Sequence, residues 1–186
     1  MRPPVSGEGT ARTFRVGQIC CRAWPADPLP LMECDTPMMI LVDADACPVK
    51  DEIYRVALRH QVAVTIVSNS PIRVPDHPLI GRIVVGDGFD AADDWIAERA
   101  DAKTVAITAD ILLADRCIKQ GAVVISPTGK PFTANSIGSA IATRAIMADL
   151  RAGGDIIGGP APFSKADRSR FLQALDEALV RLARSA

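Results

Sequence analysis

Aspartate residues follow several short apolar runs of this 186-residue sequence, at points where a buried strand would end. Five of them are the main candidates for chemistry: Asp43, Asp45, Asp93, Asp94 and Asp110. Carboxylates that meet within a few ångströms repel one another, so they must protonate, face open water or hold a cation. Hard oxygen ligands with few histidines favour Mg²⁺ or Mn²⁺ over zinc, and such ions usually meet phosphate substrates. If the cluster holds a cation, two such ions could activate a water and stabilise the leaving oxygen of a phosphodiester.

Short apolar strands alternate with helical patterns along the chain, and this alternation predicts how the aspartates come together. Strands are expected at 39–42, 62–67, 82–85, 104–108 and 122–125, and helices at about 48–60, 90–99, 110–119, 135–151 and 164–184. The order predicts an α/β fold, a three-layer sandwich with a mainly parallel five-stranded sheet and two C-terminal helices. Ligands of open parallel sheets bind outside the carboxyl ends of the strands. Three of those ends carry acidic residues, so the carboxylates are expected to converge at one edge.

Each aspartate also has an ordinary structural role that competes with metal binding. Asp110 stands where a helix N-cap belongs, and Asp93 has a favourable position in a first helical turn. Asp94 could be a plain surface residue. Asp43 is harder to explain in this way, because it follows an apolar strand directly and should be partly buried. Among the candidate aspartates, the pair Asp43 and Asp45 is therefore the strongest indication of a functional site.

Polar residues at the remaining strand ends and in the C-terminal third complete the candidate site. Those predicted to bind the substrate are Ser68, Asn69, Thr128, Lys130 and Arg144. Residues 38–125 hold nine basic and thirteen acidic residues, whereas residues 126–186 hold eight basic and five acidic. These counts are compatible with a metal site beside an anion-binding surface, although solvated helix faces explain them as well.

Cysteine usage and the length of the apolar runs indicate the compartment. The five cysteines form no Cys-x-x-Cys pair and are odd in number, which argues against a disulfide framework and suits a cytoplasmic protein. Cys47 could be a nucleophile near a helix N-terminus, but neither histidine is placed to activate it. A small buried side chain is the better interpretation of Cys47. The apolar runs are too short to cross a membrane, so no membrane partner is expected.

Residues 1–37 differ in character from the rest of the chain. They contain six of the fourteen prolines and show no sustained periodicity, so we expect a disordered N-terminal extension. Met38 and Met39 stand directly before the first strand, which suggests a translation start there that the intact mass of the native protein would test. Residues 38–186 are expected to form a single domain.

Several blocks of the sequence resemble a known family. Val42-Asp43-Ala44-Asp45-Ala46-Cys47-Pro48-Val49 resembles the opening signature of the YaiI/YqxD family of uncharacterised bacterial proteins. Later blocks are similar to that family in the same order, at 86–96, 107–114, 127–133 and 158–163. The resemblance extends over about residues 38–186 and leaves out the first 37.

A more distant resemblance is to PIN-like nucleases, and it implies roles for individual residues. Asp43 matches the aspartate that ends the first strand of those enzymes, and Asp110 matches the aspartate that follows the fourth. Asp93 or Asp94 matches the acidic residues that open a middle helix. The resemblance implies that Asp43, Asp93 and Asp110 are catalytic and hold Mg²⁺ or Mn²⁺, with Asp45 and Asp94 assisting. The implied substrate is a phosphodiester, with RNA as the expected partner.

Two other functions fit parts of the sequence. A phosphatase of the haloacid dehalogenase type also carries Asp-x-Asp after its first strand, but residues 71–85 lack the lysine that this class requires. A non-catalytic module that binds metal or RNA is the second alternative. It predicts binding without turnover, and carboxylates too far apart to share an ion.

Overall fold

The computed structural model describes residues 37–45, 47–86, 88, 90–152 and 163–185, which all belong to the unit Asp35–Ala186. The strands are β1 (Met39–Asp43), β2 (Ala63–Ser68), β3 (Ile80–Val84), β4 (Thr104–Ile107), β5 (Val123–Ile125) and β6 (Pro131–Phe132). The helices are α1 (Lys50–His60), α2 (Ala91–Arg99), α3 (Ile111–Lys119), α4 (Ala134–Ala152) and α5 (Lys165–Ser185). The extension predicted over residues 1–37 lies, apart from Pro37, outside the described residues.

The strands form one six-stranded sheet in the order β3-β2-β1-β4-β5-β6. The first five pair in parallel, and β6 pairs antiparallel with β5. The predicted α/β fold with a mainly parallel sheet is therefore confirmed, with one strand more than expected. That strand, Pro131–Phe132, is too short to show a period in the sequence, and its proline is tolerated at the edge of the sheet.

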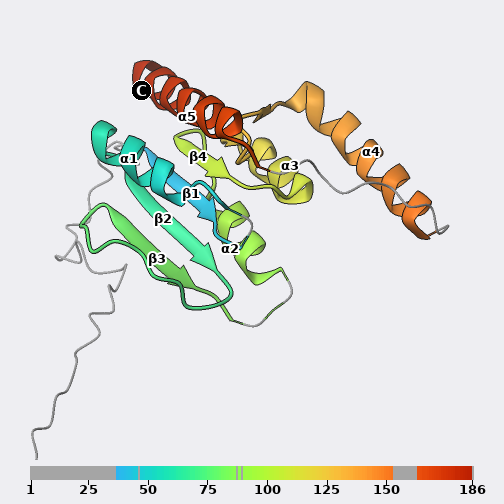
Figure 1. The fold of residues 1–186 in the computed structure, drawn as a ribbon, viewed down its shortest axis with the longest axis horizontal. Coiled ribbons are helices and arrows are strands. Elements are labelled where there is room, and N and C mark those ends of the chain that lie inside the picture. The colour runs from blue at the N-terminus through green and yellow to red at the C-terminus, as the bar shows by residue number, and fades with distance from the viewer. Residues whose placement is uncertain (1–36, 46, 87, 89, 153–162, 186) are drawn as a thin grey trace, which may run out of the picture. The chain divides into compact units, whose positions relative to one another are not determined.

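Helices cover both faces of the sheet, and the strand side chains alternate between two apolar cores. Ile40 and Val42 of β1 pack into one core with α1 and α5, whereas Leu41 packs into a second core with α2 and α3. This alternation is the strand period of two, and it produces the predicted three layers (Figure 1). Helix α4 joins the second core through Ile137 and Ile141.

Helix α5 is held by a capping box at its start and by a close contact with the loop after β5. The Ser164 hydroxyl accepts from the backbone nitrogen of Asp167 at 3.1 Å, and the Asp167 carboxylate accepts from the backbone nitrogen of Ser164 at 3.0 Å. Gly129 has a φ of +78°, and a Cβ there would lie 2.5 Å from the backbone nitrogen of Phe171. Only glycine therefore lets this loop pack against α5.

Two details of the connections bear on the sequence predictions. Helix α1 begins at Lys50 rather than at Pro48, and the proline-rich link from β2 to β3 contains no helix, as expected. In the described part of the chain, no helix is both long and apolar enough to cross a membrane.

Candidate functional site

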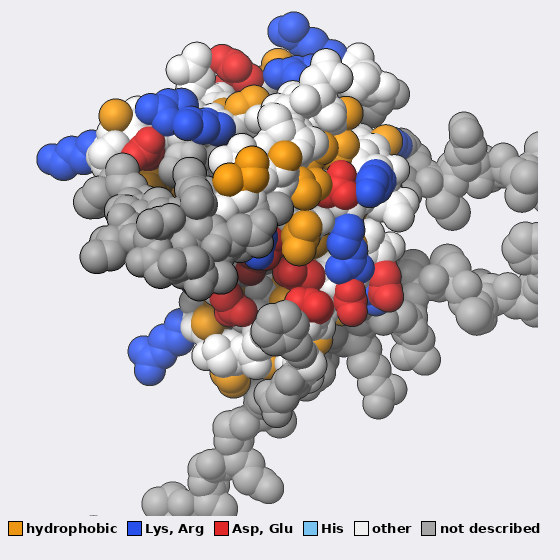
Figure 2. Space-filling model, turned by 90° about the vertical axis from the view of Figure 1, so that its right-hand side faces the viewer, with side chains coloured by type: hydrophobic (Ala, Val, Ile, Leu, Met, Phe, Trp, Pro, Cys, Tyr) orange, Lys and Arg blue, Asp and Glu red, His pale blue; other side chains and the backbone are white. Residues whose placement is uncertain are grey.

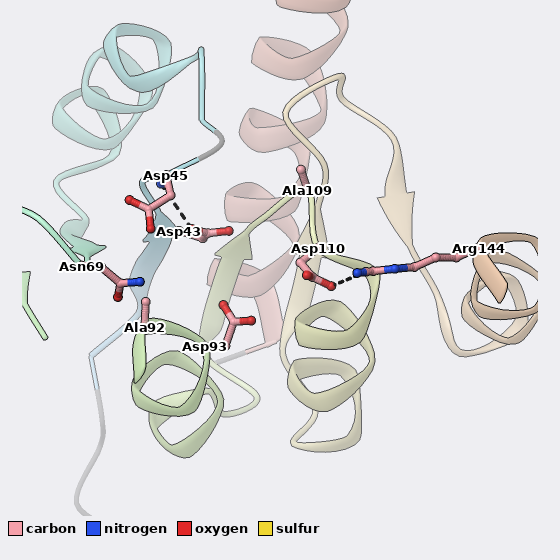
Figure 3. Close-up of a pocket in the computed structure, with 8 residues that line it drawn as sticks. All are labelled: Asp43, Asp45, Asn69, Ala92, Asp93, Ala109, Asp110 and Arg144. Carbon is pink, nitrogen blue, oxygen red and sulfur yellow. Dashed lines mark hydrogen bonds and ion pairs between the residues drawn. The ribbon is translucent and has the colours of Figure 1, made fainter. Parts of the chain in front are cut away.

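A pocket of about 400 Å³ opens at the carboxyl ends of the central strands. Its lining residues are Asp43, Asp45, Asn69, Ala92, Asp93, Ala109, Asp110 and Arg144. Figure 3 shows the aspartates and Arg144 arranged around one opening. On the molecular surface, acidic side chains gather across the middle of one face, with Lys and Arg beside them (Figure 2). The structure thus brings four of the five candidate aspartates to the sheet edge that the topology indicated.

Asp43 ends the central strand β1, and its side chain is buried, with 8% of the residue exposed. It lies on the same face of β1 as Leu41, so it points toward α2 and α3. The Thr108 hydroxyl donates to Oδ2 at 2.9 Å, and the backbone nitrogen of Asp45 donates to Oδ1 at 3.3 Å. Burial raises the pKa of Asp43, the two hydrogen bonds lower it, and the charges of Asp45 and Asp110 raise it further.

Thr108 connects Asp43 to Asp110, and the set of site residues predicted from the sequence omitted it. Strand β4 runs parallel to β1 with Ile107 opposite Val42, so Thr108 comes to lie beside Asp43. Its buried hydroxyl donates to Asp43 and accepts from the backbone nitrogen of Asp110, both at 2.9 Å. The position at a strand end was visible in the sequence, but the bond to Asp43 depends on strand order, which the sequence did not specify.

Asp93 is a partly buried aspartate of α2 that lies near the other carboxylates of the pocket, with the charge of Arg116 also acting on it. It precedes the buried Ile96 and Ala97 by three and four residues, so helical spacing places it on the face of α2 that packs on the sheet. Figure 3 shows its carboxylate directed into the pocket, where it makes no hydrogen bond or ion pair with any described residue. Partial burial, followed by the charges of Asp43 and Asp110, raises the pKa of Asp93 from 3.8 to about 6.

Asp110 combines the helix cap predicted for it with a place in the pocket. Its Oδ1 accepts from the backbone nitrogen of Leu112 at 2.7 Å, which caps α3. The same oxygen accepts from Nη1 of Arg144, a residue of α4, at 2.8 Å (Figure 3). Among the described residues no partner contacts the second carboxylate oxygen, Oδ2, so one oxygen of Asp110 is available to a ligand.

The two aspartates predicted to assist are placed differently. Asp45 is exposed and lines the pocket next to Asp43. Asp94 is not a lining residue, because its carboxylate forms an ion pair with Arg116 of α3 at 2.7 Å and its side chain is 59% exposed. One residue corresponds to about 100° around a helix axis, so Asp94 cannot share the face that directs Asp93 inward. Of these two alternatives, the structure places Asp93 in the pocket.

Two of the five predicted substrate-binding residues, Asn69 and Arg144, line the pocket. Asn69 follows the last residue of β2, and Figure 3 shows its side chain directed toward the aspartates. Its Oδ1 is buried and has no hydrogen-bond partner among the described residues. A buried polar atom without a partner is costly, so this amide is suited to bind a ligand or an ordered water.

The other three predicted substrate-binding residues, Ser68, Thr128 and Lys130, are not among the lining residues. Ser68 is fully buried and donates to the carbonyl oxygen of Ser70 at 2.7 Å. Thr128 shares a hydrogen bond of 2.9 Å with Ser126, and the Lys130 backbone nitrogen donates to the same serine. These hydrogen bonds organise the turns that follow β2 and β5.

Cys47 lies between β1 and α1, close in the chain to the aspartate pair. Both it and Cys117 are free, buried thiols. Burial raises the pKa of the Cys47 thiol to about 11. The thiolate is therefore scarce near neutral pH, and the structural interpretation of this cysteine fits its environment better than that of a nucleophile.

The donor set of the pocket suits a hard divalent cation, because it consists of carboxylate oxygens and an amide. Within the described ranges, no group of three or more His, Cys, Asp or Glu side chains forms a ready-made metal cage. Mg²⁺ usually keeps several waters and binds through one or two carboxylates together with substrate phosphates. The residues present therefore fit a cation held partly through water and substrate.

Comparisons with known proteins identify the relatives of this chain. A sequence model described as "Uncharacterized BCR, YaiI/YqxD family" matches residues 41–181, which include all of the pocket residues. A "UPF0178 protein" of Sphingopyxis alaskensis is 74% identical over 147 residues, which cover 78% of this chain and 96% of that relative. No solved structure matches the chain.

Further relatives carry the same designation. A "UPF0178 protein" of Nitrobacter winogradskyi is 61% identical over 150 residues, which cover 81% of this chain and 96% of that relative. The "UPF0178 protein bll3966" of Bradyrhizobium diazoefficiens is also 61% identical over 150 residues, with 81% and 90% covered. These names designate a family and state no activity. The chain belongs to the YaiI/YqxD family.

Proposed function

We propose that this protein is a Mg²⁺- or Mn²⁺-dependent phosphodiesterase, a nuclease that acts on RNA. The observation that carries the proposal is the pocket in which the carboxylates of Asp43, Asp93 and Asp110 surround one cavity opposite Arg144. Carboxylates attract a cation, and a guanidinium attracts the anionic phosphate that such a cation would accompany. The choice of RNA rests on the resemblance of the sequence to PIN-like nucleases.

The charge balance of the pocket supports a cation. Arg144 pairs with Asp110, whereas the carboxylate of Asp93 forms no ion pair among the described residues and is affected by the more distant charge of Arg116. The pKa of about 6 for Asp93 reflects partial burial and repulsion by Asp43 and Asp110. A divalent cation between these side chains would relieve that repulsion, and neutral water alone would not.

In the proposed reaction, the oxygen of a water molecule forms a bond to phosphorus, and the bond from phosphorus to one ester oxygen breaks. A proton from the water ends on the leaving oxygen. When bound, the cation supplies a Lewis acid that neutralises the phosphate charge. Asp43, Asp93 and Asp110 would hold it, the Thr108 hydroxyl fixes the orientation of Asp43, and Arg144 donates hydrogen bonds to the phosphate oxygens.

The phosphatase alternative receives less support from the pocket. A phosphatase of the haloacid dehalogenase type requires a lysine beside its aspartates, and no described lysine lines this pocket. A module that binds metal or RNA without catalysis remains the second alternative. It predicts binding without turnover and carboxylates too far apart to share an ion, and within the described ranges no three His, Cys, Asp or Glu side chains form a ready-made cage.

Metal binding and RNA cleavage by matched variants test the proposal. Mn²⁺ and Mg²⁺ are titrated by calorimetry into the wild type, Asp43→Asn, Asp110→Asn and Asp94→Asn, and each protein is then incubated with labelled single-stranded RNA. Asp94→Asn is the control, because it removes the same charge from an aspartate outside the pocket.

We expect the wild type and Asp94→Asn to bind metal and cleave RNA, and Asp43→Asn and Asp110→Asn to lose both. Asp43→Asn should stay folded, since a neutral amide is easier to bury than a carboxylate. Unchanged cleavage by Asp43→Asn would refute the mechanism. Metal binding without any cleavage would instead favour the non-catalytic module.

A further inference from the structure

Arg144 lies at the border between the carboxylates and the open side of the pocket. Its Nη1 donates to Oδ1 of Asp110 at 2.8 Å, and that oxygen already accepts from the backbone nitrogen of Leu112. The side chains of Arg144 and Asp110 are 48% and 34% exposed. This ion pair can therefore open without any disturbance of the apolar cores.

Helix α4 presents Arg144 to the pocket through its apolar stripe. Ile137 and Ile141 pack into the core beneath α3, and Arg144 follows them at helical spacing on the same face of α4. Helices α3 and α4 are in contact, so the guanidinium reaches the first turn of α3, where Asp110 is the cap. The position of Arg144 is thus set by packing, while its carboxylate partner can be exchanged.

A cation and Arg144 would share the charge of Asp110, because Arg144 binds Oδ1 and leaves Oδ2 open to the cation. Both are positive, both are attracted to the same carboxylate, and both border one cavity of about 400 Å³. A cation that enters alone meets an aspartate already neutralised by Arg144 and is repelled by the guanidinium itself. A phosphodiester that enters alone meets the uncompensated carboxylates of Asp43 and Asp93. Each ligand therefore encounters an obstacle that the other would remove.

We propose that Arg144 is an exchangeable counter-ion that transfers from Asp110 to the substrate phosphate, so that cation and phosphodiester bind cooperatively. This inference rests on the proposed function and adds a coupling between its two ligands. When both are present, the guanidinium donates to the phosphate oxygens, which accept a planar fork of donors well. The charge of Asp110 is then no longer shared with Arg144, so its open oxygen, Oδ2, attracts the cation more strongly. Linkage requires that each ligand raise the affinity of the other by the same factor.

The test measures Mn²⁺ affinity rather than activity. Mn²⁺ is titrated by calorimetry, and bound Mn²⁺ is quantified by paramagnetic resonance, with and without a dinucleoside phosphorothioate that resists hydrolysis. The variants are Arg144→Gln, which removes the charge, and Arg144→Lys, which keeps it. Arg99→Gln is the matched control, because it removes an arginine of similar exposure, 46%, whose partner, Glu98, is outside the pocket lining.

In the wild type we expect the phosphorothioate to raise Mn²⁺ affinity about tenfold, a coupling within the usual range. Arg144→Gln should bind Mn²⁺ alone about five- to tenfold more tightly than the wild type, and the phosphorothioate should then have almost no effect. Arg144→Lys should retain part of the coupling, and Arg99→Gln should resemble the wild type within about twofold. Circular dichroism confirms that α4 is retained in each variant.

Two results overturn the inference, and they are distinguishable from failure of the proposed function. If the wild type binds Mn²⁺ but Arg144→Gln has the same affinity, or keeps the full effect of the phosphorothioate, Arg144 is not the exchanged counter-ion. If neither protein binds Mn²⁺ under any condition, the metal site itself is refuted, and the inference fails with it.

Discussion

The raised pKa of Asp93 predicts how the stability of the folded protein depends on pH. In the metal-free protein the pKa of Asp93 is raised to about 6, chiefly by partial burial and then by Asp43 and Asp110. Since an unfolded chain gives aspartate its ordinary pKa of 3.8, the folded protein holds this proton more tightly. Stability therefore falls as the pH rises from about 4 to about 6, where the folded protein binds more protons than the unfolded chain.

The magnitude follows from the pKa difference. A shift from 3.8 to about 6 corresponds to about 3 kcal/mol at full strength. Screening by water in a half-open pocket reduces that value, and a charge in the first turn of α2 gains about 0.5 kcal/mol from the helix dipole. We therefore expect Asp93→Asn to be about 1 kcal/mol more stable than the wild type at pH 7.5, and equal to it at pH 4.

Urea unfolding at these two pH values, in buffer with a chelator, measures the difference. The neighbouring variant Asp94→Asn is the control, because its exposed ion pair with Arg116 predicts a change below about 0.5 kcal/mol at either pH. Saturating Mn²⁺ should reverse the order at pH 7.5, since only the wild type keeps the full ligand set. If Asp93→Asn were less stable than the wild type at pH 7.5 without metal, burial and like charges would not outweigh the opposing charge of Arg116, and the reasoning would be refuted.

Three other substitutions or treatments probe separate features. Thr108→Val removes the hydroxyl that bonds Asp43 and Asp110. It should lower the free energy of unfolding by about 1–3 kcal/mol, as measured with urea, and lower Mn²⁺ affinity at least about tenfold, as measured by calorimetry. An unchanged affinity would show that the hydroxyl does not position the site. Gly129→Ala adds a Cβ at a residue with positive φ, 2.5 Å from the backbone of Phe171. The substitution should lower the free energy of unfolding by more than about 1 kcal/mol. A smaller loss would mean that the loop can move away from α5 freely. Burial raises the pKa of the Cys47 thiol to about 11, so this thiol should resist iodoacetamide at pH 7.5 until the protein is unfolded. Peptide mass spectrometry measures the labelling, and rapid labelling of the native protein would contradict the burial of Cys47.

The fold was predictable because the spacing of apolar residues along the sequence differs between the strands and most of the helices. Short apolar runs such as Met39–Asp43 and Thr104–Ile107 are buried on both faces of a parallel sheet, and helices such as α1 and α3 are amphipathic. The edge strand Pro131–Phe132 escaped prediction because two residues show no period. Its pairing with β5 depends on the turn that contains Gly129, a tertiary feature.

The site was only partly predictable, for a related reason. A strand end locates a residue along the sheet edge but does not say which way its side chain points. Asp93 and Asp94 are adjacent in the chain, yet only helix phase directs the first inward and leaves the second paired with Arg116. Thr128 and Lys130 follow β5, whose turn leads into β6 rather than into the pocket. Arg144 lines the pocket because α4 packs against α3.

Helix capping and ligand binding are separable explanations for the acidic residues of the pocket. Asp110 caps α3, so a structural role would account for it without any ligand. The bonds that Asp43 accepts from Thr108 and Asp45 could also be made to the oxygen of an asparagine, so they do not explain a buried carboxylate. Asp93 makes no hydrogen bond or ion pair within the described residues, so no cap hydrogen bond accounts for it, and the dipole of α2 favours its charge only weakly. The case for a cation therefore rests on Asp43 and Asp93, while Asp110 and Arg144 determine how a phosphate would enter with it.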